Sequence, residues 1–256
     1  MTLVEWTDFE AVLFDLDGVL TPTARVHAAA WKRTFDDVLG YLSAGDFTPF
    51  DVDEEYRSYV DGRPRYDGVA TFLAARGIEL PWGHPSDDPG NDTICAIGNL
   101  KNLLVGRVLA EEGVQAYPGS LALLDELGAL DLRLAVVSAS ANAASVLAAA
   151  GIADRFDVRV DGVVTAELGL AGKPEPDSFL EAARRLPVSP EKAVVVEDAV
   201  AGVQAAIKGR FGLVIGVDRH DDPGGLRSAG ADVIVSDLSE LSTRHGGSDG
   251  TQEGRQ

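Results

Sequence analysis

The sequence Ala11-Val-Leu-Phe-Asp-Leu-Asp-Gly18 places four apolar residues directly before an acidic pair. An apolar run of this length that ends on a polar residue is typical of a buried strand in a parallel sheet. Comparable runs follow at residues 134–137, 158–160, 193–196, 213–217 and 232–235. Helical patterns lie between them, at residues 120–130, 142–150, 176–186 and 200–208. This alternation predicts an α/β fold, a doubly wound parallel sheet with helices on both faces.

Residues 23–115 do not follow the alternation. They contain helical patterns at residues 26–42, 66–76 and 94–112 and no strand of comparable quality, while residues 51–59 favour a further helical turn. Three prolines and two glycines predict a loop at residues 79–92. We therefore expect a helical cap domain at residues 23–115, inserted into a core domain made of residues 1–22 and 116–241. Residues 242–256 lack apolar side chains, and we expect a disordered tail there.

The composition bounds the partners and the compartment. A formal net charge of −19 repels nucleic acid and anionic membrane surfaces. No apolar run approaches the roughly 20 residues that span a bilayer. Cys95 is the single cysteine, which argues against a disulfide framework. We expect a cytoplasmic monomer with no nucleic-acid or membrane partner, and an anionic substrate would need cations placed locally in its site.

Polar residues gather at the predicted carboxyl ends of four strands, the edge at which open parallel sheets bind ligands. They are Asp15, Asp17, Ser138, Ser140, Lys173, Glu197 and Asp198. Phosphoryl transfer uses a set of this kind: a carboxylate nucleophile, carboxylates for a metal ion, a hydroxyl group and a lysine. The sequence therefore favours a phosphotransferase site at this edge.

The two acidic pairs have different interpretations. Asp15 at a strand end can attack phosphorus and form a covalent intermediate, and Asp17 can protonate the leaving oxygen. Alternatively, both initiate an Asp-Gly turn. Asp198, with Glu197 as a second ligand or behind it, can hold Mg²⁺ together with Asp15, because Mg²⁺ prefers oxygen ligands and few protein carboxylates. The alternative for Asp198 is the N-cap of the next helix.

Ser138 and Lys173 supply groups that bind anions. Ser138 lies between a strand and a helix, where its hydroxyl and free backbone N–H groups can bind a phosphate, although a serine N-cap is the alternative. Lys173, held by Pro174, can neutralise phosphate charge, or it belongs to an ordinary surface loop.

Four segments, taken in order, resemble the motifs of the haloacid dehalogenase superfamily. They are Phe14-Asp-Leu-Asp-Gly-Val-Leu-Thr21, Val137-Ser138, Gly172-Lys-Pro-Glu-Pro-Asp177 and Val196-Glu-Asp-Ala-Val-Ala-Gly202. The resemblance covers the whole predicted core and implies a Rossmann-like fold. It implies Asp15 as nucleophile, Asp17 as general acid and base, and Ser138 and Lys173 as ligands of the phosphoryl group.

The same resemblance implies Mg²⁺ as the cofactor. Its ligands would be Asp15, the backbone carbonyl of Asp17, and Asp198, with Glu197 nearby.

Within the superfamily, the chain is similar to the β-phosphoglucomutase-like subfamily. Thr23, His27, Trp31 and Lys32 match its Thr-x3-His-x3-Trp-Lys/Arg segment. The resemblance implies a catalytic His27 and a further set of residues that contact the substrate. These are Thr23, Trp31, Gly62, Arg65, Lys101, Asn102, Ser140 and Asn142. The alternatives are core packing for His27 and Trp31 and a solvated face for Arg65.

The sequence departs from the subfamily at Pro22, where an aspartate is usual, and at Asp61, where a lysine is expected. The cap is also longer, around residues 41–59 and 81–92. Two functions remain open. One is a mutase that interconverts β-glucose 1-phosphate and glucose 6-phosphate through an aspartyl-phosphate. The other is a phosphatase acting on a small sugar phosphate or related phosphomonoester. The cap residues favour the mutase, and the intact catalytic positions argue against a binding protein without activity.

Overall fold

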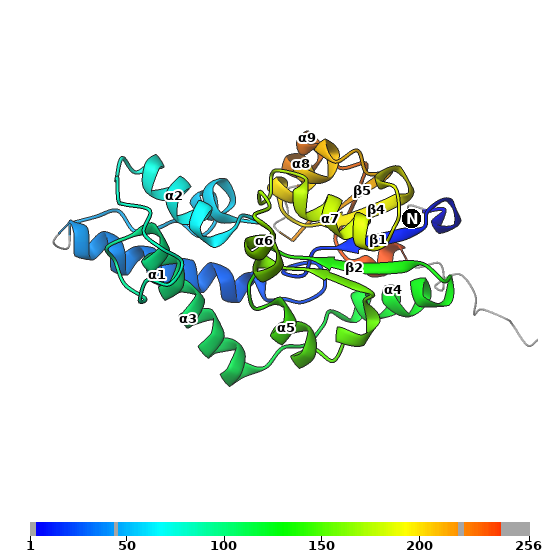
Figure 1. The fold of residues 1–256 in the computed structure, drawn as a ribbon, viewed down its shortest axis with the longest axis horizontal. Coiled ribbons are helices and arrows are strands. Elements are labelled where there is room, and N and C mark those ends of the chain that lie inside the picture. Colours follow the sequence, from blue (N-terminus) through cyan, green and yellow to red (C-terminus); the bar gives the residue numbers. More distant parts are fainter. Residues whose placement is uncertain (1–3, 44–45, 220–222, 242–256) are drawn as a thin grey trace, which may run out of the picture.

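The computed structural model describes residues 4–43, 46–219 and 223–241. Its centre is a six-stranded parallel sheet in the order β3-β2-β1-β4-β5-β6 (Figure 1). The strands are β1 (Ala11–Phe14), β2 (Arg133–Val137), β3 (Val158–Val160), β4 (Ala193–Glu197), β5 (Leu213–Val217) and β6 (Val233–Val235). Because β1 lies between β2 and β4, the residues that follow these three strands meet at one edge. The predicted α/β fold is confirmed.

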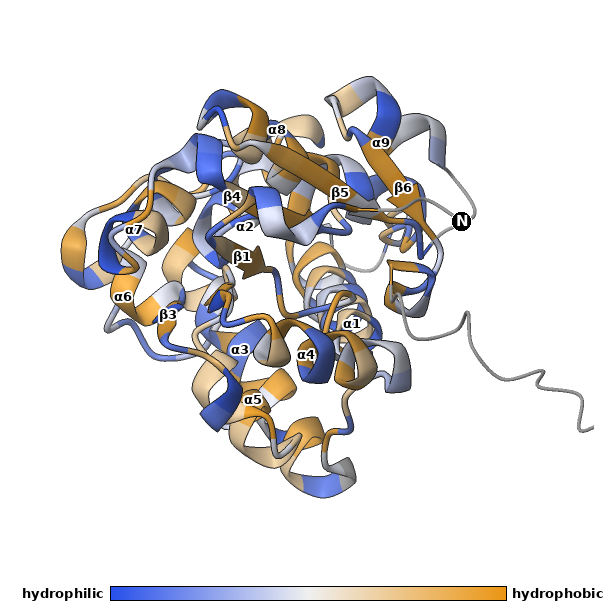
Figure 2. Ribbon diagram, turned by 90° about the vertical axis from the view of Figure 1, so that its right-hand side faces the viewer, coloured by the Kyte–Doolittle hydropathy of each residue, from blue (hydrophilic) through white to orange (hydrophobic). Residues whose placement is uncertain are grey.

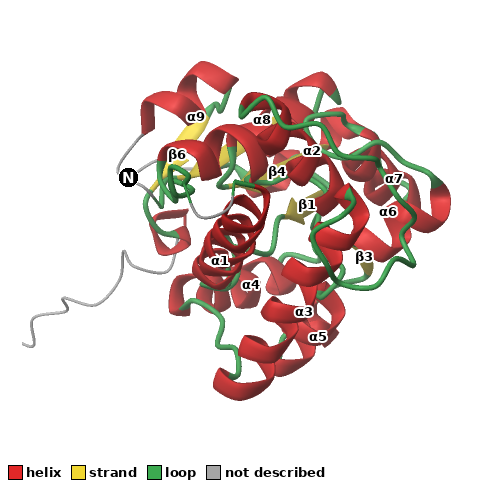
Figure 3. Cartoon of the chain, turned by 90° about the vertical axis from the view of Figure 1, so that its left-hand side faces the viewer, coloured by secondary structure: helices red, strands yellow, loops and turns green. Residues whose placement is uncertain are grey.

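Helices cover both faces of the sheet. Val12 and Phe14 face a core shared with α4 (Pro118–Ala129) and α5 (Ala143–Ala149). Ala11 and Leu13 face the opposite core, which α7 (Asp177–Arg185), α8 (Val200–Lys208) and α9 (Pro223–Ala229) complete. Side chains of a strand alternate between its faces, so each strand contributes to both cores and reads as a continuous apolar run. Figure 2 shows the apolar strands, and Figure 3 shows them enclosed by helices.

Residues 24–112, which we call the cap, are helical. Helices α1 (Ala24–Leu42), α2 (Arg65–Ala75) and α3 (Ile94–Glu112), with the π-helical turn η2 (Tyr56–Val60), gather at one end of the molecule (Figure 1). They pack around a third apolar cluster, separate from the two that flank the sheet. Its aromatic members are Trp31, Phe35, Phe50, Tyr56 and Phe72. The division into domains at residues 22/23 and 115/116 remains our proposal, and residues 242–256 lie outside the described residues.

Two glycines allow the cap to touch the core. Gly62 has a φ of +69°, and a Cβ built on it would lie 3.0 Å from the Cβ of Ala199. A Cβ on Gly172 would lie 1.9 Å from Cγ of Pro64, so a larger residue there would collide with the cap. The cap is therefore closed over the carboxyl ends of the strands.

Two short helices of the core were not predicted: α6 (Gly162–Leu168) and α9 (Pro223–Ala229). Helix α6 (Gly162–Leu168) begins at the N-cap Asp161, whose carboxylate accepts hydrogen bonds from the amides of Val163 and Val164. Among the described residues, no helix is both long enough and apolar enough to cross a membrane.

Candidate active site

Asp15 follows β1 directly and is held by the two neighbouring strands. Its amide donates to the carbonyl of Val196 in β4 at 2.9 Å. Lys173 Nζ donates to Asp15 Oδ1 at 2.5 Å, to Glu197 Oε1, and to the carbonyl of Val137 at 3.3 Å. One buried ammonium group thus joins the ends of β1, β2 and β4 and leaves Asp15 Oδ2 without a lysine contact.

The charges of this buried group are coupled. Burial raises the pKa of Asp15 well above its usual range, although the charge of Lys173 opposes the shift. Burial lowers the pKa of Lys173, but the carboxylates of Asp15 and Glu197 outweigh burial and raise it above its ordinary value. Lys173 is therefore charged at neutral pH.

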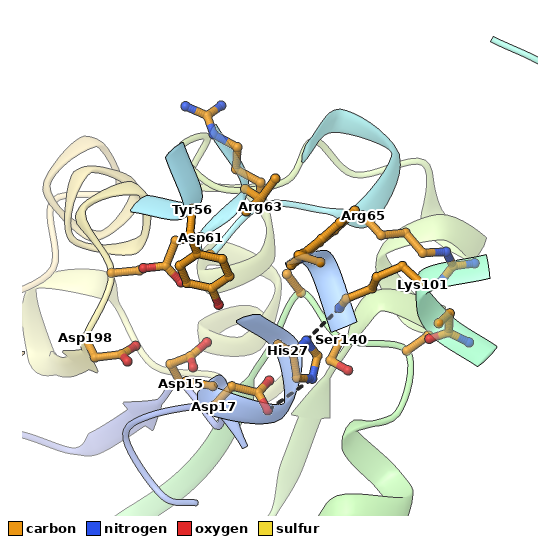
Figure 4. A pocket seen from close by; sticks show the side chains of 18 of the residues that line it. Asp15, Asp17, His27, Tyr56, Asp61, Arg63, Arg65, Lys101, Ser140 and Asp198 are labelled. Atoms are coloured by element: carbon orange, nitrogen blue, oxygen red, sulfur yellow. Dashed lines mark hydrogen bonds and ion pairs between the residues drawn. The ribbon is translucent and has the colours of Figure 1, made fainter. Parts of the chain in front are cut away.

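Asp17 lies on the turn after β1 and is held by different partners. Thr23 donates a hydrogen bond to Asp17 Oδ1, and Ser138 Oγ donates to Oδ2 at 3.2 Å. His27 Nε2 lies 3.6 Å from Oδ1. The turn needs Gly18, which has a φ of +91°. These contacts fix the carboxyl group of Asp17 beside that of Asp15 (Figure 4).

Asp198 completes the acidic side of the site. It packs so closely on the turn that a Cβ on Gly18 would lie 1.8 Å from Asp198 Oδ2. Burial, followed by the charges of Asp61, Glu197 and Asp15, raises the pKa of Asp198 well above its usual range. Because these carboxylates outnumber the cations near them, a further positive charge in the cavity would stabilise them.

The carboxylate oxygens of Asp15 and Asp198 are suitable ligands for Mg²⁺. Among the described residues, no cluster of three or more His, Cys, Asp or Glu side chains has metal-binding geometry. Mg²⁺ is commonly held by one or two carboxylates, with water and substrate phosphate in its other positions. Asp15 and Asp198 meet that requirement. Both oxygens of Glu197 are already engaged, Oε1 by Lys173 and Oε2 by the amide of Ala199 at 2.9 Å.

A cavity of about 60 Å³ lies between the cap and the core. Most of the predicted site residues line it: Asp15, Asp17, His27, Trp31, Gly62, Arg65, Lys101, Asn102, Ser140, Glu197 and Asp198. The others contact these residues from outside the cavity: Thr23 and Ser138 bind Asp17, Lys173 binds Asp15, and Asn142 binds Asn102. Figure 4 shows the core carboxylates on one side, with the amino end of Lys101 directed toward them at His27 and the side chain of Arg65 extending away from them.

The cap supplies a nitrogen-rich side to the cavity. Lys101 Nζ lies 2.8 Å from His27 Nδ1 and 4.8 Å from the centroid of the Trp31 ring. Burial, followed by the charge of Lys101, lowers the pKa of His27 to about 4, while Asp17 opposes the shift. Burial lowers the pKa of Lys101 to about 7. A charged Lys101 can only donate, so His27 accepts at Nδ1 and carries its proton on Nε2, toward Asp17.

Polar side chains of the core and cap meet at the same end. Asn142 Nδ2 donates to Asn102 Oδ1 at 2.9 Å, and the amide of Asn142 donates to Ser140 Oγ at 3.1 Å. Arg65 Nη2 donates to Tyr66 Oη at 2.8 Å. The first contact joins α3 to the loop after β2, and the last lies within the start of α2.

Three further polar residues of the cavity were not predicted as site residues: Tyr56, Asp61 and Arg63. Tyr56 is buried on η2, and burial raises the pKa of its phenol well above 10. Burial, followed by the charge of Glu197, raises the pKa of Asp61 to about 7. For Asp61, the only signal in the sequence was an acidic residue where a lysine is expected, and Tyr56 had no signal as a site residue.

Comparison with known proteins identifies the family. The model for haloacid dehalogenase-like hydrolases matches residues 9–209. The chain belongs to this family. It is 48% identical over 238 residues to a β-phosphoglucomutase of Mycobacterium bovis, a match that covers 90% of each chain. It is 32% identical over 236 residues to the β-phosphoglucomutase of Bacillus subtilis, again with 91% of each chain covered.

Solved structures agree with this assignment. The crystal structure of a β-phosphoglucomutase from Clostridium difficile matches with a TM-score of 0.72 and 26% identity, over 92% of this chain and 94% of that one. The family resemblance noted in the sequence is confirmed, and the protein is an enzyme of this class.

Proposed function

We propose that this enzyme is a Mg²⁺-dependent β-phosphoglucomutase that interconverts β-glucose 1-phosphate and glucose 6-phosphate. One observation carries the proposal: cationic groups lie on both the core side and the cap side of the cavity. Lys173 lies at Asp15 in the core, whereas Arg65 and Lys101 enter from the cap. A phosphatase needs only the cation on the core side. A mutase has to hold a sugar with a phosphate at each end, as the similarity to known β-phosphoglucomutases also suggests.

Asp15 is the proposed nucleophile. Lys173 holds Asp15 Oδ1 and leaves Oδ2 to attack phosphorus, so that the Oδ2–P bond forms while the bond to the leaving oxygen breaks. In this proposal, the ammonium group of Lys173 and the hydroxyl group of Ser138 stabilise the charge that develops on the transferred phosphoryl group.

Asp17 is the proposed general acid and base. Protonated, it donates its proton to the leaving oxygen; in the reverse direction it takes the proton of the attacking sugar hydroxyl. Thr23 and Ser138 hold its two oxygens, and His27 faces it with the Nε2 proton. These residues keep the carboxyl group aligned with the oxygen that gains or loses the phosphoryl group.

Mg²⁺ would be held by Asp15, the backbone carbonyl of Asp17, and Asp198, with Glu197 nearby. When bound, it would supply positive charge to the phosphoryl oxygens and to the acidic groups around them. In this proposal, Glu197 mainly fixes Lys173.

The second phosphate would lie on the cap side. Arg65, Lys101, Asn102, Ser140 and Asn142 offer donors there, and Gly62 lets the cap loop approach the core. Trp31 forms part of the cavity wall. Closure of the cap over Asp15 keeps water away from the aspartyl-phosphate, which favours transfer to sugar over hydrolysis.

The alternative is a phosphatase of the same family, in which Asp17 activates water. Asp61 is the observation that favours it, because a carboxyl group in place of a cation weakens the attraction for an anionic sugar. The half-charged state implied by a pKa of about 7 limits this effect at neutral pH.

The proposal is tested by incubating the enzyme with Mg²⁺, β-glucose 1-phosphate and a trace of glucose 1,6-bisphosphate. Glucose 6-phosphate and free phosphate are measured in the same samples. We expect glucose 6-phosphate with little free phosphate, and no reaction with α-glucose 1-phosphate. Release of phosphate without isomerisation would replace the mutase by the phosphatase.

A further inference from the structure

The cap carries a loop at residues 81–92 that the proposed function leaves unexplained. None of the described residues that line the active-site cavity comes from this loop. The loop is nevertheless ordered by its own contacts. Thr93 Oγ1 and the amide of His84 both donate to Asp87 Oδ2, at 2.7 and 3.0 Å. The amide of Ile94 donates to the carbonyl of Pro81 at 3.0 Å. The loop is thus fastened to the start of α3.

Asn99 connects the loop to the active site. Its Nδ2 donates to the carbonyls of Pro85 and Asp87, at 3.1 and 2.9 Å. Carbonyl oxygens only accept, so the amide must present its nitrogen to the loop and its oxygen to the other side. On that side, Asn99 Oδ1 accepts a hydrogen bond from Tyr66 Oη at 2.9 Å.

Tyr66 links the oriented amide of Asn99 to the guanidinium group of Arg65. Its oxygen donates to Asn99 and therefore accepts from Arg65 Nη2, at 2.8 Å. The guanidinium carbon of Arg65 also lies 4.6 Å from the centroid of the Tyr66 ring. Gly98 makes room for the ring, because a Cβ there would lie 2.7 Å from Cδ1 of Tyr66.

One nitrogen of the Arg65 guanidinium group, Nη2, is held by a hydrogen bond within the described residues, whereas another, Nε, is not. This Nε atom is buried and has no hydrogen-bond partner among the described residues. The side chain lines the cavity, and its charge contributes to the lowered pKa of Lys101. Figure 4 shows the side chain extending from the cap loop on the same side of the cavity as Lys101. A guanidinium group held in this way presents free donors to an anion and has less freedom to lose on binding.

We propose that Tyr66 and Asn99 are positioning residues, which set Arg65 for the phosphate of the sugar that does not react, and that the loop at residues 81–92 holds Asn99 in place. This inference rests on the proposed function, since it assumes a ligand with a second phosphate. It assigns the longer cap a role in substrate specificity.

The test measures binding of glucose 1,6-bisphosphate by titration calorimetry, in the presence of Mg²⁺. The background is Asp15→Asn, which prevents turnover. Into it are introduced Arg65→Ala, Tyr66→Phe, Asn99→Ala, Asp87→Ala and the control Thr71→Ala, which alters an α2 side chain that does not line the cavity. We expect Arg65→Ala to raise Kd about 10- to 100-fold, as for loss of charged hydrogen bonds. Tyr66→Phe and Asn99→Ala should raise it about 3- to 10-fold.

A double-mutant cycle distinguishes the positioning of Arg65 by Tyr66 from a purely structural role of Tyr66. Tyr66→Phe should have little further effect once Arg65 is alanine, because it acts through Arg65. Equal losses with and without Arg65, or affinities equal to that of Thr71→Ala, would overturn the proposal. Asp87→Ala should raise Kd by a smaller factor. An unchanged Kd would mean that the loop at residues 81–92 does not hold Asn99 in place.

The inference and the proposed function can fail separately. If the wild-type enzyme only releases phosphate but the variants still lose affinity for the bisphosphate, the mutase fails and the positioning role stands. If the Asp15→Asn protein binds the bisphosphate no more tightly than glucose 6-phosphate, there is no second phosphate site and the inference falls.

Discussion

Asp15 and Asp17 are two residues apart, yet different partners hold them. Lys173 binds Asp15, whereas the hydroxyl groups of Thr23 and Ser138 bind Asp17. The charge of Lys173 opposes the effect of burial on the pKa of Asp15, whereas Asp17 is held by two hydroxyl groups and faces His27 Nε2 at 3.6 Å. The proposed roles of Asp15 as nucleophile and Asp17 as general acid thus depend on these neighbours.

Replacing Asp17 by asparagine tests its proposed role. An amide can retain contacts to Thr23 and Ser138 but cannot exchange a proton, so we expect kcat to fall by about 10²- to 10⁴-fold. The midpoint of thermal unfolding should stay close to that of the wild type, which shows that the loss is chemical. A kcat within twofold of the wild type would remove Asp17 from the proton transfer.

The lowered pKa of Lys101 predicts that kcat/KM depends on pH. Its pKa of about 7 means that it is charged below pH 7 and becomes neutral as the pH rises through that value. Its attraction for a sugar phosphate should therefore weaken on the alkaline side. We expect kcat/KM of the wild type, divided by that of Lys101→Arg, to fall between pH 6 and 8.5, because arginine stays charged. Dividing by the arginine variant cancels the ionisation of the substrate, and a flat ratio would contradict the role of Lys101.

At the scale of the elements, the cap depends on an aromatic cluster. The ring of Phe72 in α2 is fully buried, with centroids 4.1 Å from Phe35 and 5.0 Å from Phe50. Phe72→Ala should reduce the free energy of unfolding by about 3–5 kcal/mol, and Phe72→Leu by less, because less volume is lost. Urea denaturation measures both. A loss below about 1 kcal/mol for alanine would mean that α2 does not depend on this cluster.

The strands were predictable because both of their faces are buried, as β4 illustrates with its continuous apolar run at residues 193–196. The helix α6 has only seven residues and no clear apolar period, so its one signal was the N-cap Asp161. The helical turn expected within residues 51–59 is present as η2, but its π-helical form could not be predicted, since the bond from the amide of Asp61 to the carbonyl of Tyr56 leaves no local pattern.

The candidate site likewise has a part that could be predicted from the sequence and a part that could not. The core carboxylates could be predicted because each follows a strand, and strand ends converge by topology. The contact between His27 and Lys101 joins residues 74 positions apart, and only the packing of α1 on α3 creates it. The family resemblance named both residues, but their separation along the sequence could not reveal the contact.

At the scale of the whole molecule, we propose that the fit of the cap against the core determines whether water reaches Asp15. Gly172→Ala would place a Cβ 1.9 Å from Pro64 and push the cap away. We expect the ratio of free phosphate to glucose 6-phosphate to rise about tenfold, which is ~1.4 kcal/mol in relative barriers. Gly106→Ala is the matched control, because no atom lies within 4 Å of its added Cβ. An unchanged ratio in an active Gly172→Ala enzyme would mean that this contact does not exclude water.

The proposed mechanism requires that Asp15 carries a phosphoryl group and passes it to a sugar. To detect this transfer, the enzyme is reacted with ³²P-labelled glucose 1,6-bisphosphate and Mg²⁺, the label is located by peptide mapping, and unlabelled β-glucose 1-phosphate is added as a chase. We predict label on Asp15 that moves to the sugar bisphosphate faster than it appears as free phosphate. Absence of label on Asp15, or its loss as free phosphate at the same rate with and without the sugar, would contradict the account.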